Sequence, residues 1–108
     1  MLESIVVRKI RDRLKARGAW SVKTHGAPMQ TRGLPDILAC YKGRFLAIEV
    51  KAPRARRDMT PLQAHTLEEI SNAGGWAFSA RSWERVEYVL NLIDGEDDDS
   101  KADTGGCG

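Results

Sequence analysis

The chain of 108 residues is 42% hydrophobic and 30% charged, a composition typical of one globular domain and not of a disordered segment. No apolar run approaches the roughly 20 residues that a membrane-spanning helix needs, so we expect no integral membrane protein. Two cysteines are too few for a disulfide framework, and the first residues show no signal-peptide pattern, so we expect a cytoplasmic protein.

The formal net charge of +2 hides an uneven distribution of charge along the chain. Residues 94–103 contain six acidic side chains and one lysine, a net charge of −5, so residues 1–93 carry +7. This distribution favours a polyanionic partner over a small neutral ligand, although a well-solvated surface would have the same composition. We expect one folded domain over residues 1–93 and an acidic, glycine-rich, disordered tail over residues 94–108.

The first part of the chain has the pattern of a helix, a strand and a loop. Apolar residues at helical spacing predict a helix over residues 3–17, which Gly18 ends. Alternating apolar residues predict a strand over residues 19–25, and glycine and proline predict a loop over residues 26–34.

Two apolar runs at the centre of the chain, residues 35–41 and 45–51, predict a β-hairpin around the glycine-containing segment 42–44. A basic loop follows over residues 52–59, and Thr60 and Gln63 have the spacing of a capping box at the start of a second helix. A short strand over residues 76–80 and a last helix from Ser82 to about Ile93 complete the pattern. The order αβββαβα predicts a domain of mixed α/β (α+β) class, with an antiparallel hairpin at its centre.

The length of the hairpin turn decides which side chains meet. If Lys42-Gly43 is a two-residue turn, Asp36 lies directly across from Glu49, with their Cβ atoms about 5 Å apart on one face. Lys51 then projects from the same face, two residues after Glu49. A three-residue turn would instead place the two carboxylates on opposite faces of the hairpin.

Two carboxylates and one amine on a single face form a candidate metal site. Carboxylate oxygens at this separation suit Mg²⁺ or Mn²⁺, and an ammonium group beside them can stabilise the charge of a phosphate. The same residues could also be surface charges held by salt bridges, which contribute little to stability. However, Asp36 and Glu49 lie within apolar runs, where a charge is costly unless it is paired or bound to a metal.

Three segments of the sequence resemble one enzyme superfamily. Gly33-Leu34-Pro35-Asp36, then Ile48-Glu49-Val50-Lys51, then Gln63 at a helix start resemble the PD-(D/E)XK nucleases, and within them the VRR-NUC (virus-type replication-repair nuclease) group. The resemblance covers about residues 3–90. It implies a restriction-endonuclease-like αβββαβ core, in which a mixed central sheet is flanked by helices.

The resemblance also implies roles for individual residues. Asp36, Glu49, the backbone carbonyl of Val50 and Glu3 would bind Mg²⁺ or Mn²⁺, with Lys51 and Gln63 completing the catalytic group. For two of these residues a structural role is an open alternative: Gln63 fits a capping box, and Glu3 is a favourable charge in the first turn of a helix.

Basic side chains near the expected site could contact DNA phosphates, although each could also be a solvated surface charge. These residues are Lys23, Arg32, Arg54, Arg56 and Arg57.

The sequence therefore predicts a metal-dependent deoxyribonuclease that hydrolyses phosphodiester bonds. The resemblance implies a structure-specific endonuclease acting on branched DNA such as Holliday junctions, working as a homodimer, and of phage or prophage origin in a bacterial host. Two alternatives stay open. One is a non-catalytic, basic nucleic-acid-binding module in which the carboxylates form salt bridges, and the other is a nuclease subunit that needs a replication or repair partner.

Overall fold

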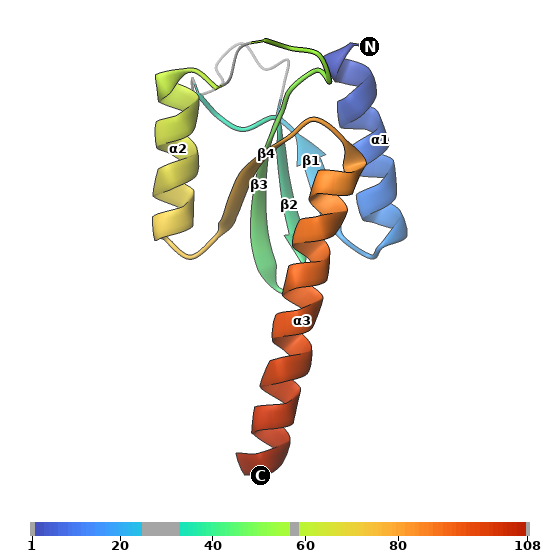
Figure 1. Cartoon of the computed structure of the whole chain (residues 1–108), viewed down its shortest axis with the longest axis vertical. Helices are drawn as coiled ribbons and strands as arrows, with labels where there is room; N and C mark the ends of the chain where they lie inside the picture. Colours follow the sequence, from blue (N-terminus) through green and yellow to red (C-terminus); the bar gives the residue numbers. More distant parts are fainter. Residues whose placement is uncertain (1, 25–32, 57–58, 108) are drawn as a thin grey trace.

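The computed structural model describes residues 2–24, 33–56 and 59–107, with side chains described as far as residue 96. Seven elements follow one another in the expected order of helices and strands (Figure 1). They are α1 (Glu3–Ala16), β1 (Trp20–Lys23), β2 (Ile37–Tyr41), β3 (Arg44–Val50), α2 (Pro61–Asn72), β4 (Trp76–Ala80) and α3 (Trp83–Cys107).

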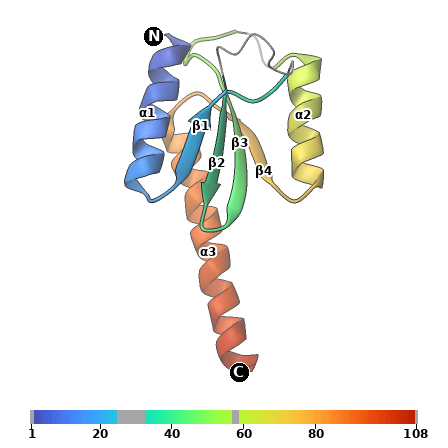
Figure 2. The same cartoon turned by 180° about the vertical axis from the view of Figure 1, so that it is seen from behind.

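The four strands form one mixed sheet in the order β1-β2-β3-β4. Strands β1, β2 and β3 pair with one another in antiparallel order, and β4 joins the edge parallel to β3. Helices α1 and α3 lie against one face of the sheet, while α2 lies on the other side next to β4 (Figures 1 and 2). The fold is the predicted α+β arrangement of a mixed sheet flanked by helices.

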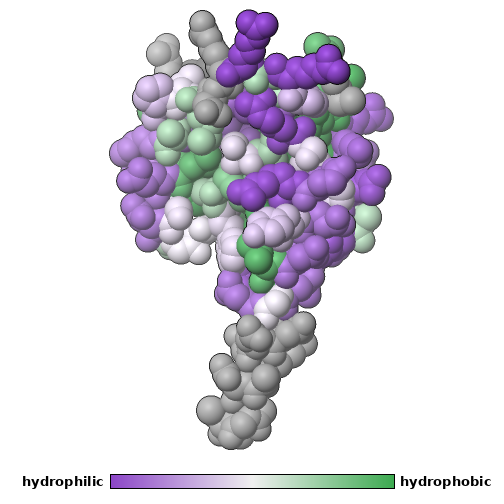
Figure 3. Space-filling view, viewed as in Figure 1, coloured by the Kyte–Doolittle hydropathy of each residue, from purple (hydrophilic) through white to green (hydrophobic). Residues whose placement is uncertain are grey.

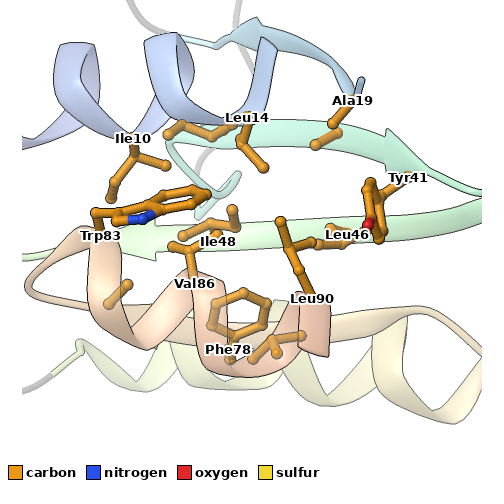
Figure 4. Close-up of a cluster of buried hydrophobic side chains, with 14 of the residues drawn as sticks. Ile10, Leu14, Ala19, Tyr41, Leu46, Ile48, Phe78, Trp83, Val86 and Leu90 are labelled. Carbon is orange, nitrogen blue, oxygen red and sulfur yellow. The ribbon is translucent and has the colours of Figure 1, made fainter. Parts of the chain in front are cut away.

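The hydrophobic core lies between the sheet, α1 and α3 (Figure 4). Leu46, Ile48 and Val50 point into it from β3 and are fully buried, because alternate residues of a strand lie on one face. Side chains of the two helices close the core from the other side: Ile10, Leu14, Trp83, Val86 and Leu90. On the opposite face of β3, Ala47 and Glu49 are also buried whereas Phe45 is exposed, so the strand is covered on both sides from Leu46 onward.

The hairpin between β2 and β3 has a two-residue turn, one of the two lengths that the sequence left open. Lys42 and Gly43 both have positive φ angles, 49° and 81°, as the two central residues of a type I′ turn require. Tyr41 pairs with Arg44, and Ile37 pairs with Ile48. Extending this register by one residue places Asp36 opposite Glu49, so the alternative of a three-residue turn is wrong.

The last helix is longer than we expected. We predicted that it ends at about Ile93, whereas the backbone of α3 continues to Cys107 through residues that we expected to be disordered. Asp94 accepts hydrogen bonds from the Tyr41 hydroxyl (2.8 Å), Lys42 (2.6 Å) and Arg17 (3.0 Å). Hydrogen bonds from Lys42 and Tyr41 lower the pKa of the Asp94 carboxyl.

These bonds tie α3 to the hairpin turn and to the end of α1, so Asp94 belongs to the folded part of the chain. The division between a domain over residues 1–93 and an acidic tail over residues 94–108 stays a prediction. No helix in the described part of the chain combines the length and the apolar character that a membrane crossing requires.

Two glycine-to-alanine substitutions test the turn and the extended helix. Gly43→Ala should lower the free energy of unfolding by about 1–2 kcal/mol, because alanine is strained at a positive φ.

Gly95→Ala, where a new Cβ meets no atom within 4 Å, should raise the free energy of unfolding by up to about 1 kcal/mol if the helix continues there in solution. Both changes are measured by urea denaturation. No gain from Gly95→Ala would show that the helix frays before residue 95.

Candidate metal centre

The two predicted carboxylates meet in the structure. Asp36 lies immediately before β2, and Glu49 lies in β3 next to the last residue of that strand. Both residues are only 3% exposed. The Val50 amide donates a hydrogen bond to Asp36 Oδ2 (2.7 Å), and the carboxyl groups of Asp36 and Glu49 hydrogen-bond to each other. The register of the hairpin therefore brings two acidic groups into direct contact in a site closed to solvent.

The raised pKa of Glu49 shows that this arrangement disfavours the ionised carboxylate. Burial, followed by the negative charge of Asp36 and the hydrogen bond with it, raises the pKa of Glu49 from 4.5 to about 8, against the opposing effect of Lys51. Without a cation, Glu49 therefore keeps its proton near neutral pH. A divalent cation in place of that proton would neutralise both groups.

Lys51 is the third predicted member of the site, and it lies beside the carboxylates. Its backbone amide donates to the Ala80 carbonyl (3.0 Å), which holds the chain to the end of β4 just after β3 stops. Its ammonium nitrogen is 3.8 Å from Glu49 Oε2 and 3.3 Å from Gln63 Oε1. The amine is therefore positioned by one group on β3 and one group on α2.

Gln63 forms the capping box and also contacts Lys51, while its catalytic role stays a prediction. Its side-chain oxygen accepts a hydrogen bond from the Thr60 backbone amide (2.9 Å), and its backbone amide donates to the Thr60 hydroxyl (3.2 Å). The capping box is therefore complete. The same side-chain oxygen accepts from Lys51. The bonds that start α2 therefore also fix the position of an oxygen against the ammonium group.

The structure brings Glu3 and Val50 only partly into this centre. The charge of Glu3 contributes to the raised pKa of Glu49, so α1 begins near the site. Within the described residues, however, no three His, Cys, Asp or Glu side chains gather as a metal-binding group. The roles of Glu3 and of the Val50 carbonyl as ligands stay predictions.

The predicted DNA-contacting residues fall into two groups. Lys23, Arg54 and Arg56 are exposed, whereas Arg32 and Arg57 lie outside the described residues. No sequence pattern pointed to Arg81, which donates to the carbonyls of Ala52 (3.0 Å) and Ala55 (2.7 Å) and so holds the loop that carries Arg54. A basic residue just after a strand is too common a pattern to reveal this contact.

The chemistry of these residues fits a hard divalent cation such as Mg²⁺ or Mn²⁺. Such ions take oxygen ligands, often from one or two carboxylates, and complete their coordination with water and phosphate. Asp36 and Glu49 supply two buried oxygen donors that repel each other when both are ionised. The neighbouring ammonium group adds a positive charge for a phosphate.

Comparison with solved structures supports the fold. A solved structure titled "VRR_NUC domain" is 24% identical with a TM-score of 0.64, over 82% of this chain and 94% of that one. A structure of Hjc from Archaeoglobus fulgidus, titled a Holliday junction resolvase from an archaeal hyperthermophile, is 24% identical with a TM-score of 0.56. It matches 71% of this chain and 65% of that one. At this identity the two structures show the fold alone.

A comparison with curated proteins found no match. A family model described as archaeal Holliday junction resolvase (hjc) matches residues 4–97, which include the acidic pair, Lys51 and Gln63. Because this match spans most of the sequence, the chain belongs to the family of archaeal Holliday junction resolvases.

Proposed function

We propose that this protein is a divalent-metal-dependent endonuclease that cuts branched DNA such as Holliday junctions. The observation that carries the proposal is the buried contact between Asp36 and Glu49, with the Lys51 ammonium 3.8 Å from Glu49. Membership of the resolvase family supports a nuclease and a branched substrate. Sites that hydrolyse phosphodiesters commonly combine carboxylates, a divalent cation and a nearby positive charge.

Each residue of the centre has a distinct part in the proposed reaction. Asp36 and Glu49 would hold Mg²⁺ or Mn²⁺, which when bound supplies an activated water and a positive charge on the phosphate. Lys51 would stabilise the negative charge that develops on the phosphate and orient the water. Gln63 would keep the Lys51 ammonium in position, because its oxygen is fixed by the capping box.

We further propose that the active form is a homodimer. Two symmetric cuts across a four-way junction need two sites, and a two-fold dimer would place one site on each of two opposite arms. Tyr88 and Leu92 are 55% and 44% exposed and lie four residues apart on α3, which makes them candidates for the contact between copies. The mass in solution, measured by light scattering, tests the dimer independently of cleavage.

Cleavage of synthetic DNA tests the proposal directly. The protein should cut a labelled four-way junction in Mg²⁺ or Mn²⁺ in preference to a flap, a linear duplex or a single strand. EDTA should abolish the cleavage. Lys51→Ala should lower the rate at saturating DNA by about a hundredfold or more, because it removes a charge-stabilising group. Lys9→Ala, an exposed lysine on α1, should leave the rate unchanged.

The same assay separates the nuclease from its alternatives. Junction binding without EDTA-sensitive cleavage would indicate a non-catalytic binding module and would contradict the proposal. Cleavage only after addition of a replication or repair protein would indicate a dependent subunit. Full activity of Lys51→Ala would remove the amine from the mechanism.

A matched pair of variants separates the two roles of Gln63. Thr60→Ala and Gln63→Ala each break the capping box and should each lower the free energy of unfolding by about 1 kcal/mol. Only Gln63→Ala also removes the oxygen that Lys51 contacts, so only this variant should lower kcat strongly at unchanged KM. Equal kcat values for the two variants would show that Gln63 is solely a helix cap. Urea denaturation and single-turnover kinetics provide the two readouts.

A further inference from the structure

A groove with a basic lining runs between α1 and the free edge of β1, separate from the residues of the metal centre. Its volume is about 780 Å³, and Figure 2 shows the two elements side by side. The side of the molecule that α1 forms is largely hydrophilic (Figure 3). The charged and aromatic residues of the lining are Arg8, Arg11, Asp12, Lys15, Trp20 and Lys23.

The positive charges in this groove lack acidic partners. Four cations line it against a single carboxylate, and in the part of the chain that is described none of the four forms an ion pair. By contrast, Arg17, Lys42 and Lys51 elsewhere on the protein each lie beside a carboxylate. Like charges gathered in a concave surface repel one another, so an anionic ligand would be attracted there.

One of the cations is held in place across the groove. Arg11 donates from Nε to the Ser21 hydroxyl (3.3 Å) and from a terminal nitrogen to the Ser21 carbonyl (3.4 Å). These bonds join α1 to the outer edge of β1. They cover a backbone carbonyl that an added strand would need, so this edge is poorly suited to pair with a peptide strand.

The spacing of the cations suits a nucleic-acid backbone. Residues 8, 11 and 15 are three and four positions apart, so they lie on one face of α1. Residues 8 and 15 are separated by about 10 Å along the helix axis, because each residue adds about 1.5 Å. A DNA strand advances about 3.4 Å per nucleotide, so this stripe spans about three nucleotide steps.

One end of the groove is lined by residues adjacent to those of the metal centre. Ser4, at one end of the lining, follows Glu3, whose charge acts on Glu49. Lys23, also in the lining, pairs with Ile37, the residue after Asp36. At its edge Trp20 is 65% exposed and offers an apolar surface to a sugar or base.

We propose that this groove binds the sugar–phosphate backbone of one DNA strand next to the cleavage site. Arg8, Arg11 and Lys15 are thereby DNA-contacting residues in addition to those predicted from the sequence. The inference rests on the proposed function, because it takes DNA as the ligand of the metal centre.

Two double variants with equal loss of charge test the inference. Arg8→Gln with Lys15→Gln removes one arginine and one lysine from the groove. Lys9→Gln with Arg13→Gln removes the same two residue types from another face of α1, outside the lining. All four side chains are exposed, so both proteins should fold, and thermal unfolding checks this. Binding of a labelled four-way junction is measured by fluorescence anisotropy in EDTA, so that no cleavage occurs.

The groove variant should bind the junction at least about tenfold more weakly than the control variant in the same buffer. Its plot of log Kd against log salt should also lose a slope of roughly two, because two phosphate contacts are removed. Equal weakening by the two double variants would overturn the inference and would leave the groove to an acidic protein or to solvent. If the wild-type protein binds through the groove but never cleaves, the inference stands while the proposed nuclease falls.

Discussion

The constraint on which this structure depends is the contact between two buried carboxyl groups, Asp36 and Glu49. Burial and mutual repulsion raise the pKa of Glu49 to about 8, so the pair is costly to ionise in the absence of a cation. A fold that needed only stability would gain from apolar residues at these two positions. We therefore interpret the acidic pair as a binding site for a positive ion. The proposed nuclease activity depends on this site.

Other features of the fold keep this contact in place. The two-residue turn at Lys42 and Gly43 sets the register that aligns the carboxyl groups, and a slip of one residue would turn one of them to the opposite face. The start of α2 holds the Lys51 ammonium through Gln63, and α1 carries a basic groove toward the same end of the sheet. The β2–β3 hairpin, the start of α2 and the basic groove along α1 thus meet at one end of the domain.

Much of this arrangement could be predicted from the sequence, because it depends on local signals. Glycine at position 43 marks the place of the turn, an apolar run marks the buried strand β3, and the Thr60–Gln63 spacing marks the start of α2. The contacts that were missed join residues far apart in the chain: Asp94 with Tyr41, and Arg81 with the Ala52 carbonyl. No local pattern reveals such pairs. The phage origin and the cytoplasmic location stay predictions.

The pH dependence of stability with and without a divalent cation tests the central claim most directly. The folded protein keeps a proton on Glu49 up to about pH 8, whereas the unfolded chain loses it near pH 4.5. The free energy of unfolding of the metal-free protein should therefore fall as the pH rises between these values. Mn²⁺ should restore stability most strongly at the upper end, where it displaces the proton, and should lose this effect in Asp36→Asn and Glu49→Gln. A flat profile, or equal stabilisation of all three proteins by Mn²⁺, would contradict a shared metal site.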